Sequence, residues 1–266
     1  GDLEAAQQHS DDSHKAAQIA QDPRMMMETL NLTGLLHLIK GEYDEAQQAL
    51  TTVLPIAREL DDRDKLGNIL NSFGAVAEGL GSREDALKYL VEAREIAGET
   101  GNRFLAANAA GNLGRLTYAQ QDFAKAKIYF EQALKLFREM GNSYGEAIAL
   151  YYLGFIEIDL GNDAEAVFFL HGSLLLSRDI GAVAMTLIAL CGIARLWENM
   201  GQTERAVELI ALIRNHPDSS ADIDIDRFSS PILDRLQTSL APETFETVFE
   251  RGKVRSLDQA VDDILS

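Results

Sequence analysis

The sequence predicts an all-α protein in which antiparallel helix pairs stack into a right-handed superhelical solenoid, closed by a short C-terminal helical cap. Three observations predict this fold. Alanine and leucine, the strongest helix formers, dominate the 266 residues, whereas only 5 are proline. Small residues recur along the chain at a spacing of forty residues. Each interval of forty also holds two turn signals, so each is expected to contain two helices.

Two sets of small residues recur every forty residues at a constant offset from each other, and we call each set a column. The first column is Ala6, Ala46, Ala86, Ala126, Ala166 and Ala206, and the second is Gly34, Gly74, Gly114, Gly154 and Ala194. Large apolar residues follow the alanine column four positions later, at Leu50, Leu90, Phe130, Leu170 and Ile210. Overpacking a site where two helices touch costs about 1–3 kcal/mol. We therefore expect both columns to mark the closest approaches between paired helices.

Residues that favour turns separate the predicted helices twice in each unit. The first turn column is Gly1, Gly41, Gly81, Gln121, Gly161 and Gly201. The second contains Asp61-Asp62, Gly101-Asn102, Gly141-Asn142 and Gly181-Ala182. Glycine ends a helix in the left-handed conformation at little cost, and asparagine and aspartate tolerate turns. Each unit is thus expected to be a helix A of about 15 residues, a short turn and a helix B of similar or greater length.

Gly34, Ala46 twelve positions later and then Leu50 together resemble the consensus of the tetratricopeptide repeat. The usual unit of that family has about 34 residues, so the forty-residue unit is similar to a long-repeat subclass. That subclass occurs in bacterial signal-transduction ATPases (STAND proteins) and LuxR-type regulators, including the maltose-responsive activator. The resemblance covers residues 1–214, as a half repeat over 1–20 and five pairs. It implies a solenoid of helix pairs and says little about a ligand.

The repeat pattern stops after Ile213. Residues 215–230 are polar, acidic and rich in turn formers, which predicts a linker, and 231–266 predict a helical capping segment that Pro231 opens. The alternating aspartates in 222–226 lack the downstream glycine and glutamate of a calcium loop. The segments 245–252 and 256–261 resemble the closing part of regulators in which a nucleotide-binding module precedes the repeats. Gly1 occupies a turn column and 2–20 predict a helix B without its helix A, so we expect upstream domains to be missing.

Composition argues against several classes of function. A formal net charge of −18 disfavours direct nucleic-acid binding by this segment, because that binding needs basic side chains. The single cysteine, Cys191, allows neither an internal disulfide nor a thiolate cluster and fits a reducing, cytoplasmic location. No apolar run suits a membrane span. The sequence has neither a phosphate-binding loop nor a nucleophile elbow, and its five histidines are scattered. We expect no enzyme, no catalytic residue, no metal and no cofactor.

Candidate binding residues therefore come from the A helices, which line the concave side of such solenoids. Positions at −6, −3, +1 and +4 from the Gly34 column are predicted to face the groove. They yield eight candidate residues for binding a ligand or partner: Asn68, Asn71, Asn108, Arg115, Tyr118, Tyr151, Phe155 and Arg195. Amides suit a peptide backbone, arginine a carboxylate and rings an apolar group. The alternative is that these side chains are solvated or cover neighbouring helices.

These observations predict a non-catalytic sensor or scaffold domain of a larger bacterial signalling or transcriptional regulator. It would bind a protein, a peptide or a small polar effector through the concave groove. Switching would require the ligand to have different affinities for two conformations. A constitutive protein-interaction adaptor without a switching role is the alternative. An enzyme is the third class, and only through upstream domains.

Overall fold

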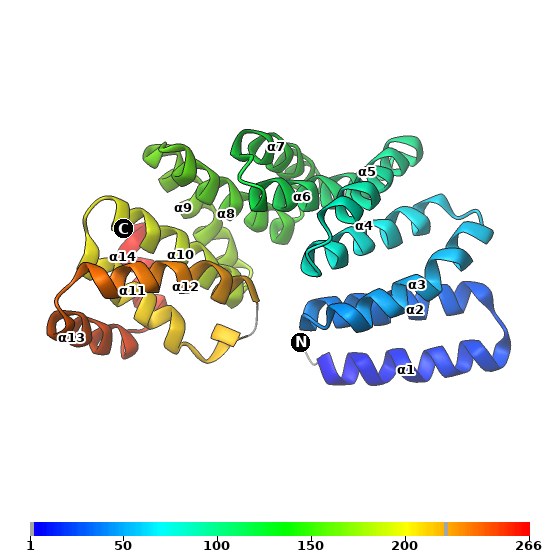
Figure 1. The fold of residues 1–266 in the computed structure, drawn as a ribbon, viewed down its shortest axis with the longest axis horizontal. Coiled ribbons are helices and arrows are strands. Elements are labelled where there is room, and N and C mark those ends of the chain that lie inside the picture. Colours follow the sequence, from blue (N-terminus) through cyan, green and yellow to red (C-terminus); the bar gives the residue numbers. More distant parts are fainter. Residues whose placement is uncertain (1–2, 221–222) are drawn as a thin grey trace. The chain divides into compact units, whose positions relative to one another are not determined.

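The computed structural model describes residues 3–220 and 223–266, and within these ranges it contains helices and no strand (Figure 1). The predicted all-α fold is therefore confirmed for the described residues. The chain forms two compact units, which we call unit 1 (Gly1–Leu136) and unit 2 (Phe137–Ser266). The division of the chain into a repeat domain of 1–214, a linker and a cap stays a prediction.

Unit 1 is built from helices joined by short turns. The helices are α1 (Leu3–Ala20), α2 (Pro23–Lys40), α3 (Tyr43–Glu59), α4 (Arg63–Gly79), α5 (Arg83–Thr100), α6 (Arg103–Ala119) and α7 (Phe123–Met140), whose last turn belongs to unit 2. Each of the helices α1 to α5 packs against the next one in sequence, so neighbours are antiparallel. The even-numbered helices α2, α4 and α6 are the predicted A helices.

Unit 2 continues the same alternation and ends in the C-terminal segment. Its helices are α8 (Ser143–Leu160), α9 (Asp163–Asp179), α10 (Val183–Asn199), α11 (Thr203–Asn215), α12 (Ile223–Ser239), α13 (Pro242–Lys253) and α14 (Leu257–Leu265), with a 3₁₀ turn at Pro217–Ser220. The helices α8 to α11 pack in sequence order. Of the C-terminal helices, α12 packs on α10 and α11, α13 packs on α11, and α14 contacts α9.

The turns confirm both predicted turn columns over the described residues. Every turn glycine has a positive φ, for example 75° at Gly41. Gln121 and Asp61 adopt the same region with φ of 61° and 53°. In the second column, a side chain also caps the following A helix: Asn102 Oδ1 accepts from the Leu105 amide at 2.9 Å. Asn142 caps α8 in the same way. The turn position Gly1 lies outside the described residues.

The glycines of the second column contact the large apolar residues that lie four positions after the alanines of the first column. Five alanines of the first column are fully buried: Ala46, Ala86, Ala126, Ala166 and Ala206. A Cβ atom added at Gly74 would lie 2.4 Å from Leu90, and one added at Gly154 would lie 2.5 Å from Leu170. Such distances leave no room for a larger side chain. The columns therefore are the predicted closest approaches, except that the side chain of Ala6 is outside the described part.

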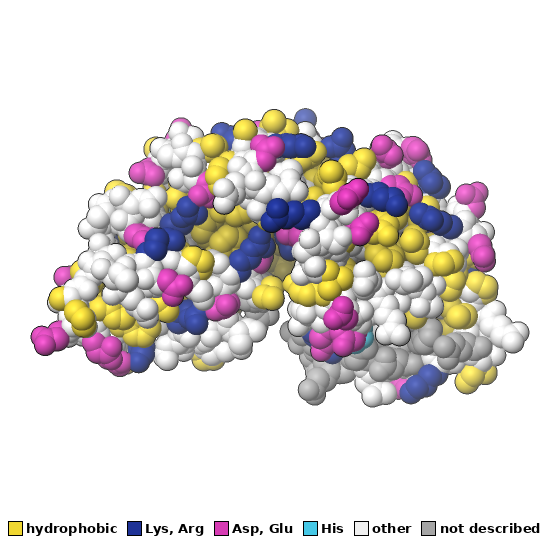
Figure 2. Space-filling model, in the orientation of Figure 1, with side chains coloured by type: hydrophobic (Ala, Val, Ile, Leu, Met, Phe, Trp, Pro, Cys, Tyr) yellow, Lys and Arg dark blue, Asp and Glu magenta, His cyan; other side chains and the backbone are white. Residues whose placement is uncertain are grey.

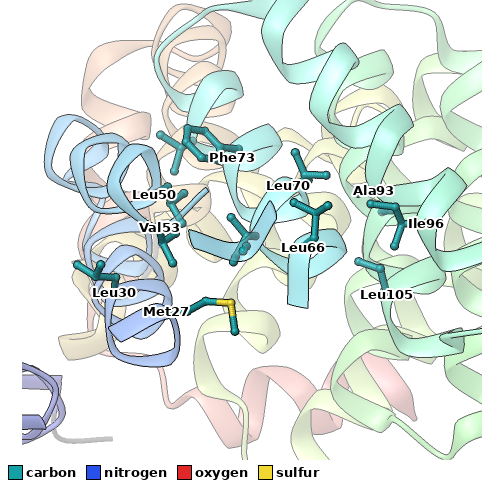
Figure 3. Close-up of a cluster of buried hydrophobic side chains, with 14 of the residues drawn as sticks. Met27, Leu30, Leu50, Val53, Leu66, Leu70, Phe73, Ala93, Ile96 and Leu105 are labelled. Carbon is teal, nitrogen blue, oxygen red and sulfur yellow. The ribbon is translucent and has the colours of Figure 1, made fainter. Parts of the chain in front are cut away.

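A continuous hydrophobic cluster holds α2 to α6 of unit 1 together. Figure 3 shows its side chains reaching inward from successive helices, among them Met27, Leu50, Phe73, Ile96 and Leu105. Each of these is at least 95% buried. Because burial of such a side chain contributes about 1.5–3 kcal/mol, packing between helices stabilises each pair more than helix propensity does.

The C-terminal segment begins its first helix earlier than the sequence analysis predicts. We expected a linker over 215–230 and a helix opening at Pro231, but α12 starts at Ile223 and contains Pro231 in its interior. Two features explain the earlier start. Asp224 and Asp226 lie in the first turn, where the helix dipole favours acidic groups. A buried stripe at helical spacing then runs through Ile225, Phe228, Ile232 and Leu236.

Candidate functional site

The candidate residues of unit 1 lie on one face of α4 and α6, which we call the A-helix face of unit 1. Asn68 and Asn71 come from α4, and Asn108, Arg115 and Tyr118 come from α6. All five are half-buried. Their side chains are thus partly covered and still reach solvent, as a binding surface requires.

Side-chain amides contact each other across this face. Asn112 on α6 donates from Nδ2 to Asn71 Oδ1 on α4, at 3.1 Å. Asn68 Nδ2 donates to the carbonyl of Asp64 one turn earlier, at 3.0 Å. On α2, the buried Oδ1 of Asn31 has no hydrogen-bond partner. Asn31 occupies the repeat position of α2 that corresponds to Asn71 of α4, forty residues later. We call Asn31, Asn71, Asn108 and Asn112 the amide row. Asn112 is not among the residues predicted from the sequence, and the signal that could have identified it is its place next to the groove position that corresponds to Asn71.

Arg115 already faces a carboxylate of its own chain. Its Nη2 lies 3.2 Å from Glu78 Oε2, with the two side chains 30% and 10% exposed. A carboxylate ligand would therefore compete with Glu78 for Arg115. Tyr118 lies beside Phe123 of α7, with ring centroids 5.6 Å apart. Arginine and ring thus occupy the end of α6, beyond the amide row.

Two of the three candidate residues of unit 2, Tyr151 and Phe155, have a different environment, because α12 covers them. Tyr151 and Phe155 on α8 are 4% and 1% exposed. Phe228 of α12 stacks on Phe155 with centroids 4.1 Å apart and an interplanar angle of 12°. Its ring also makes an edge contact with Tyr151 at 6.4 Å. In this structure both side chains pack against α12, so a ligand reaches them only if α12 moves.

Polar contacts accompany these rings. Tyr152 of α8 donates from its hydroxyl to Asp224 Oδ2 of α12 at 3.2 Å. On α10, Glu198 accepts two hydrogen bonds from Arg235 of α12, at 2.8 and 2.7 Å. The candidate Arg195 instead forms a forked pair with Asp159 of α8, at 3.3 and 2.5 Å. Tyr152, Phe228 and Asp224 could not be predicted as partners from the sequence, because α12 lies about seventy residues after α8.

Groups that could carry chemistry are dispersed or shielded in both units. Cys191 of α10 is fully buried, and this burial raises the pKa of its thiol strongly. Burial lowers the pKa of His171. Over the described ranges, no three histidine, cysteine, aspartate or glutamate side chains are grouped as metal ligands, and no helix is apolar and long enough to cross a bilayer. On the face shown in Figure 2, acidic and basic side chains are interspersed with apolar ones.

The sequence model of the tetratricopeptide repeat family matches residues 25–99 and 65–139. These residues are tetratricopeptide repeats. The match covers α3 to α6 and most of α2 and α7, and so includes the amide row on α4 and α6. No curated protein matches the sequence.

Several solved structures share the tetratricopeptide-type fold. BtubC (BKLC) from P. vanneervenii is 17% identical with a TM-score of 0.62, over 91% of this chain and 94% of that one. A STAND protein with a tetratricopeptide repeat sensor, from Pyrococcus horikoshii, is 15% identical with a TM-score of 0.61. The match includes 95% of this chain but only 42% of that protein. Kinesin light chain repeats from Podosopora anserina are 16% identical with a TM-score of 0.55, over 80% of this chain and 97% of that one. At these identities the likeness is one of fold.

Proposed function

We propose that this chain is a non-catalytic binding domain of a larger bacterial signalling or transcriptional regulator and that it captures a protein or peptide segment in its concave groove. The observation that carries the proposal is the half-buried amide row on the A-helix face of unit 1, which lies within the tetratricopeptide repeats. An extended peptide presents alternating N–H and C=O groups, and a side-chain amide both donates and accepts. The row formed by Asn31, Asn71, Asn108 and Asn112 therefore suits a peptide backbone, independent of its side chains.

Arg115 and Tyr118 would add selectivity at the end of this row. The guanidinium carries a planar set of donors that suits a carboxylate, and the neighbouring ring offers apolar contact. Because Glu78 lies 3.2 Å from Arg115, an acidic side chain or a small polar effector binds only by replacing that contact. An acidic group of the partner would take the place of Glu78 beside Arg115, which a neutral partner could not do. Without a partner, Arg115 stays paired with Glu78.

The sensor role rests on two further observations. The STAND protein of similar fold carries a tetratricopeptide repeat sensor as part of a longer chain. The closing segments of this chain, 245–252 and 256–261, also resemble those of long-repeat LuxR-type regulators. We expect the full coding sequence to place a nucleotide-binding loop before Gly1. In the cell this chain would be cytoplasmic and would not itself bind nucleic acid or a membrane.

A constitutive adaptor is the second candidate. BtubC matches over 94% of its own length, so this fold also occurs in a chain of similar extent. A coding sequence without a nucleotide-binding or effector domain upstream would favour the adaptor over the sensor.

Binding by the amide row can be tested with peptides selected from a random library displayed on phage. The chain with both Asn71→Ala and Asn108→Ala should bind a selected peptide at least tenfold more weakly in a calorimetric titration. Lys88→Ala on the exposed side of α5 is the matched control and should bind normally. Thermal unfolding of all three proteins shows whether the fold is intact. Equal affinities for the double variant and the unmodified chain would exclude the amide row as the site.

A further inference from the structure

We call the side of α8 and α10 that carries the groove positions Tyr151, Phe155 and Ile188 the A-helix face of unit 2. Helix α12 lies on this face in the manner of a bound amphipathic helix. It packs on α10, and its ring Phe228 enters a slot formed by Tyr151, Tyr152 and Phe155 of α8. Ile158 of α8 and Ile188 of α10, at the +4 and −6 groove positions, are also buried. The face of unit 2 that the repeat pattern assigns to ligands is therefore occupied by a helix of the same chain.

Three contacts define the chemistry of the occupant. Asp224 accepts a hydrogen bond from the Tyr152 hydroxyl at 3.2 Å. Phe228, four positions later, stacks on Phe155 at 4.1 Å between centroids. Arg235, seven positions further, forms two hydrogen bonds with Glu198. These positions fall on one side of a helix, because four and seven residues correspond to about one and two turns. The face thus selects an acidic group, a phenylalanine and a basic group at fixed spacing.

Two features limit how strongly α12 is held on this face outside its buried apolar stripe. Pro231 lies inside the helix, where it supplies no backbone N–H donor and disfavours a regular helical turn. Its ion pairs are also exposed on one side: Arg235 is 48% exposed, and Asp226, paired with Arg214, is 67% exposed. Such pairs are screened by water and salt and hold a helix weakly.

The rest of the C-terminal segment is attached independently of α12. Helix α13 packs on α11, where Gly252 allows its backbone to approach Glu208 so closely that an added Cβ would lie 2.2 Å from the Glu208 carbonyl oxygen. Helix α14 contacts α9. Opening of α12 therefore leaves α13 and α14 in place as a cover for the B helices of unit 2.

We propose that the A-helix face of unit 2 is a docking site for a partner helix, and that α12 is its resident occupant. The partner is an amphipathic helix of another protein that carries an acidic residue, a phenylalanine four positions later and a basic residue seven positions after that. This inference rests on the proposed function, because it assumes that A-helix faces of this chain receive partners. It assigns to unit 2 a site distinct from the amide row of unit 1, and the two sites are tested separately.

Hydrogen exchange of the unmodified chain tests whether α12 opens by itself. Local opening should make the amides of α12 exchange at least tenfold faster than those in the middle of α10, with α13 protected. Exchange of α12 as slow as that of α10 would overturn the proposal, because α12 would then leave only when the whole unit unfolds.

Direct occupancy is tested with a fluorescent peptide of the sequence 223–239. A tethered helix competes at an effective concentration in the millimolar range, so the unmodified chain should bind the peptide weakly. Phe228→Ala in the chain weakens the resident helix and should tighten peptide binding roughly thirtyfold. Arg235→Ala weakens α12 without altering the ring slot and should act in the same direction. Phe245→Ala on α13 is the control and should leave peptide affinity unchanged.

Three outcomes would overturn the proposal. The first is equal peptide affinity for the unmodified chain and for both variants, Phe228→Ala and Arg235→Ala. The second is a dimer of the unmodified chain that forms with rising concentration and exchanges α12, since a second copy would then be the occupant. The third is loss of peptide binding in the Asn71→Ala and Asn108→Ala variant, which would place the peptide in unit 1. That last result would still support the proposed function.

Discussion

The two units use the same helix-pair architecture, but their A-helix faces differ in polarity and in exposure. In unit 1 the groove positions carry Asn71, Asn108 and Arg115, which are polar and half-buried. In unit 2 the equivalent rows carry Tyr151 and Phe155, which are buried under α12. The small-residue columns fix the pairing of helices in both units, so the groove rows are free to differ. The repeat therefore determines where a face lies, and the residues on that face determine whether another segment covers it.

Removing residues 223–266 should have the largest effect on this comparison. The deletion exposes Phe155 on the A-helix face and Ile210 and Ile213 on α11, all of which are at most 1% exposed in the full chain. Contiguous apolar surface of this kind promotes association. We expect aggregation or a marked shift to higher mass in light scattering. A truncated chain that stays monomeric with the melting temperature of the full chain would show that unit 2 needs no cover.

Copying the face of unit 2 onto unit 1 should have the next largest effect. Gly111→Tyr and Arg115→Phe place the two ring residues of α8 at the equivalent positions of α6. Unit 1 contains no helix in the role of α12 among its described residues, so these rings should stay exposed. We expect stronger binding of a hydrophobic dye and self-association in sedimentation experiments. Dye binding no different from that of the unmodified chain would mean that polarity does not distinguish the two faces.

The small-residue columns should behave alike in both units. Ala126→Leu in unit 1 and Ala166→Leu in unit 2 each add three carbon atoms to a fully buried side chain at a closest approach. Both should lower the free energy of unfolding by about 1–3 kcal/mol. Ala124→Leu, at an exposed position of α7, is the control and should change it by less than about 0.5 kcal/mol. Denaturant titrations followed by circular dichroism measure all three. Equal effects at Ala124 and Ala126 would contradict the assignment of Ala126 to a closest approach between helices.

The turn column should give the smallest effect. Gln121 adopts φ of 61° at a position where unit 2 has Gly161, with φ of 78°. Gln121→Gly relieves a left-handed strain of about 1–2 kcal/mol but adds unfolded-state entropy, so we expect a net gain below about 1 kcal/mol. Gly161→Ala should produce a loss of about 1 kcal/mol or more. Thermal unfolding should give a higher melting temperature for Gln121→Gly than for Gly161→Ala. A Gly161→Ala protein more stable than the unmodified chain would contradict the preference for glycine at this positive φ.

The periodic parts of the fold could be predicted from sequence because they depend on local rules. Positive φ at the turn glycines follows from helix termination, and burial of Ala46 or Ala206 follows from a column of small residues. The start of α12 could not be placed as easily. Pro231 predicts a helix start, whereas the helix begins earlier, at Ile223, with acidic residues in its first turn and with Ile225 and Phe228 buried.

The candidate site could be predicted only as a set of positions. Repeat spacing assigned Asn68 and Tyr151 alike to the A-helix faces, but the cover over Tyr151 comes from a segment far away in sequence. One signal was present. The rows of unit 2 hold Tyr151, Phe155, Ile158 and Ile188, which is more apolar than a solvated groove tolerates. Apolar residues at groove positions therefore indicate an occupant, although they do not identify it.

The buried thiol of Cys191 has a practical consequence. It is the only cysteine of the chain, is fully inaccessible, and lies on α10, the helix against which α12 packs. Burial raises the pKa of this thiol and keeps it protonated, so reaction with a disulfide reagent requires that Cys191 first become exposed to solvent. The rate at which the chain reacts with such a reagent therefore reports how often motions expose Cys191 on α10. The measurement needs neither a label nor an added residue.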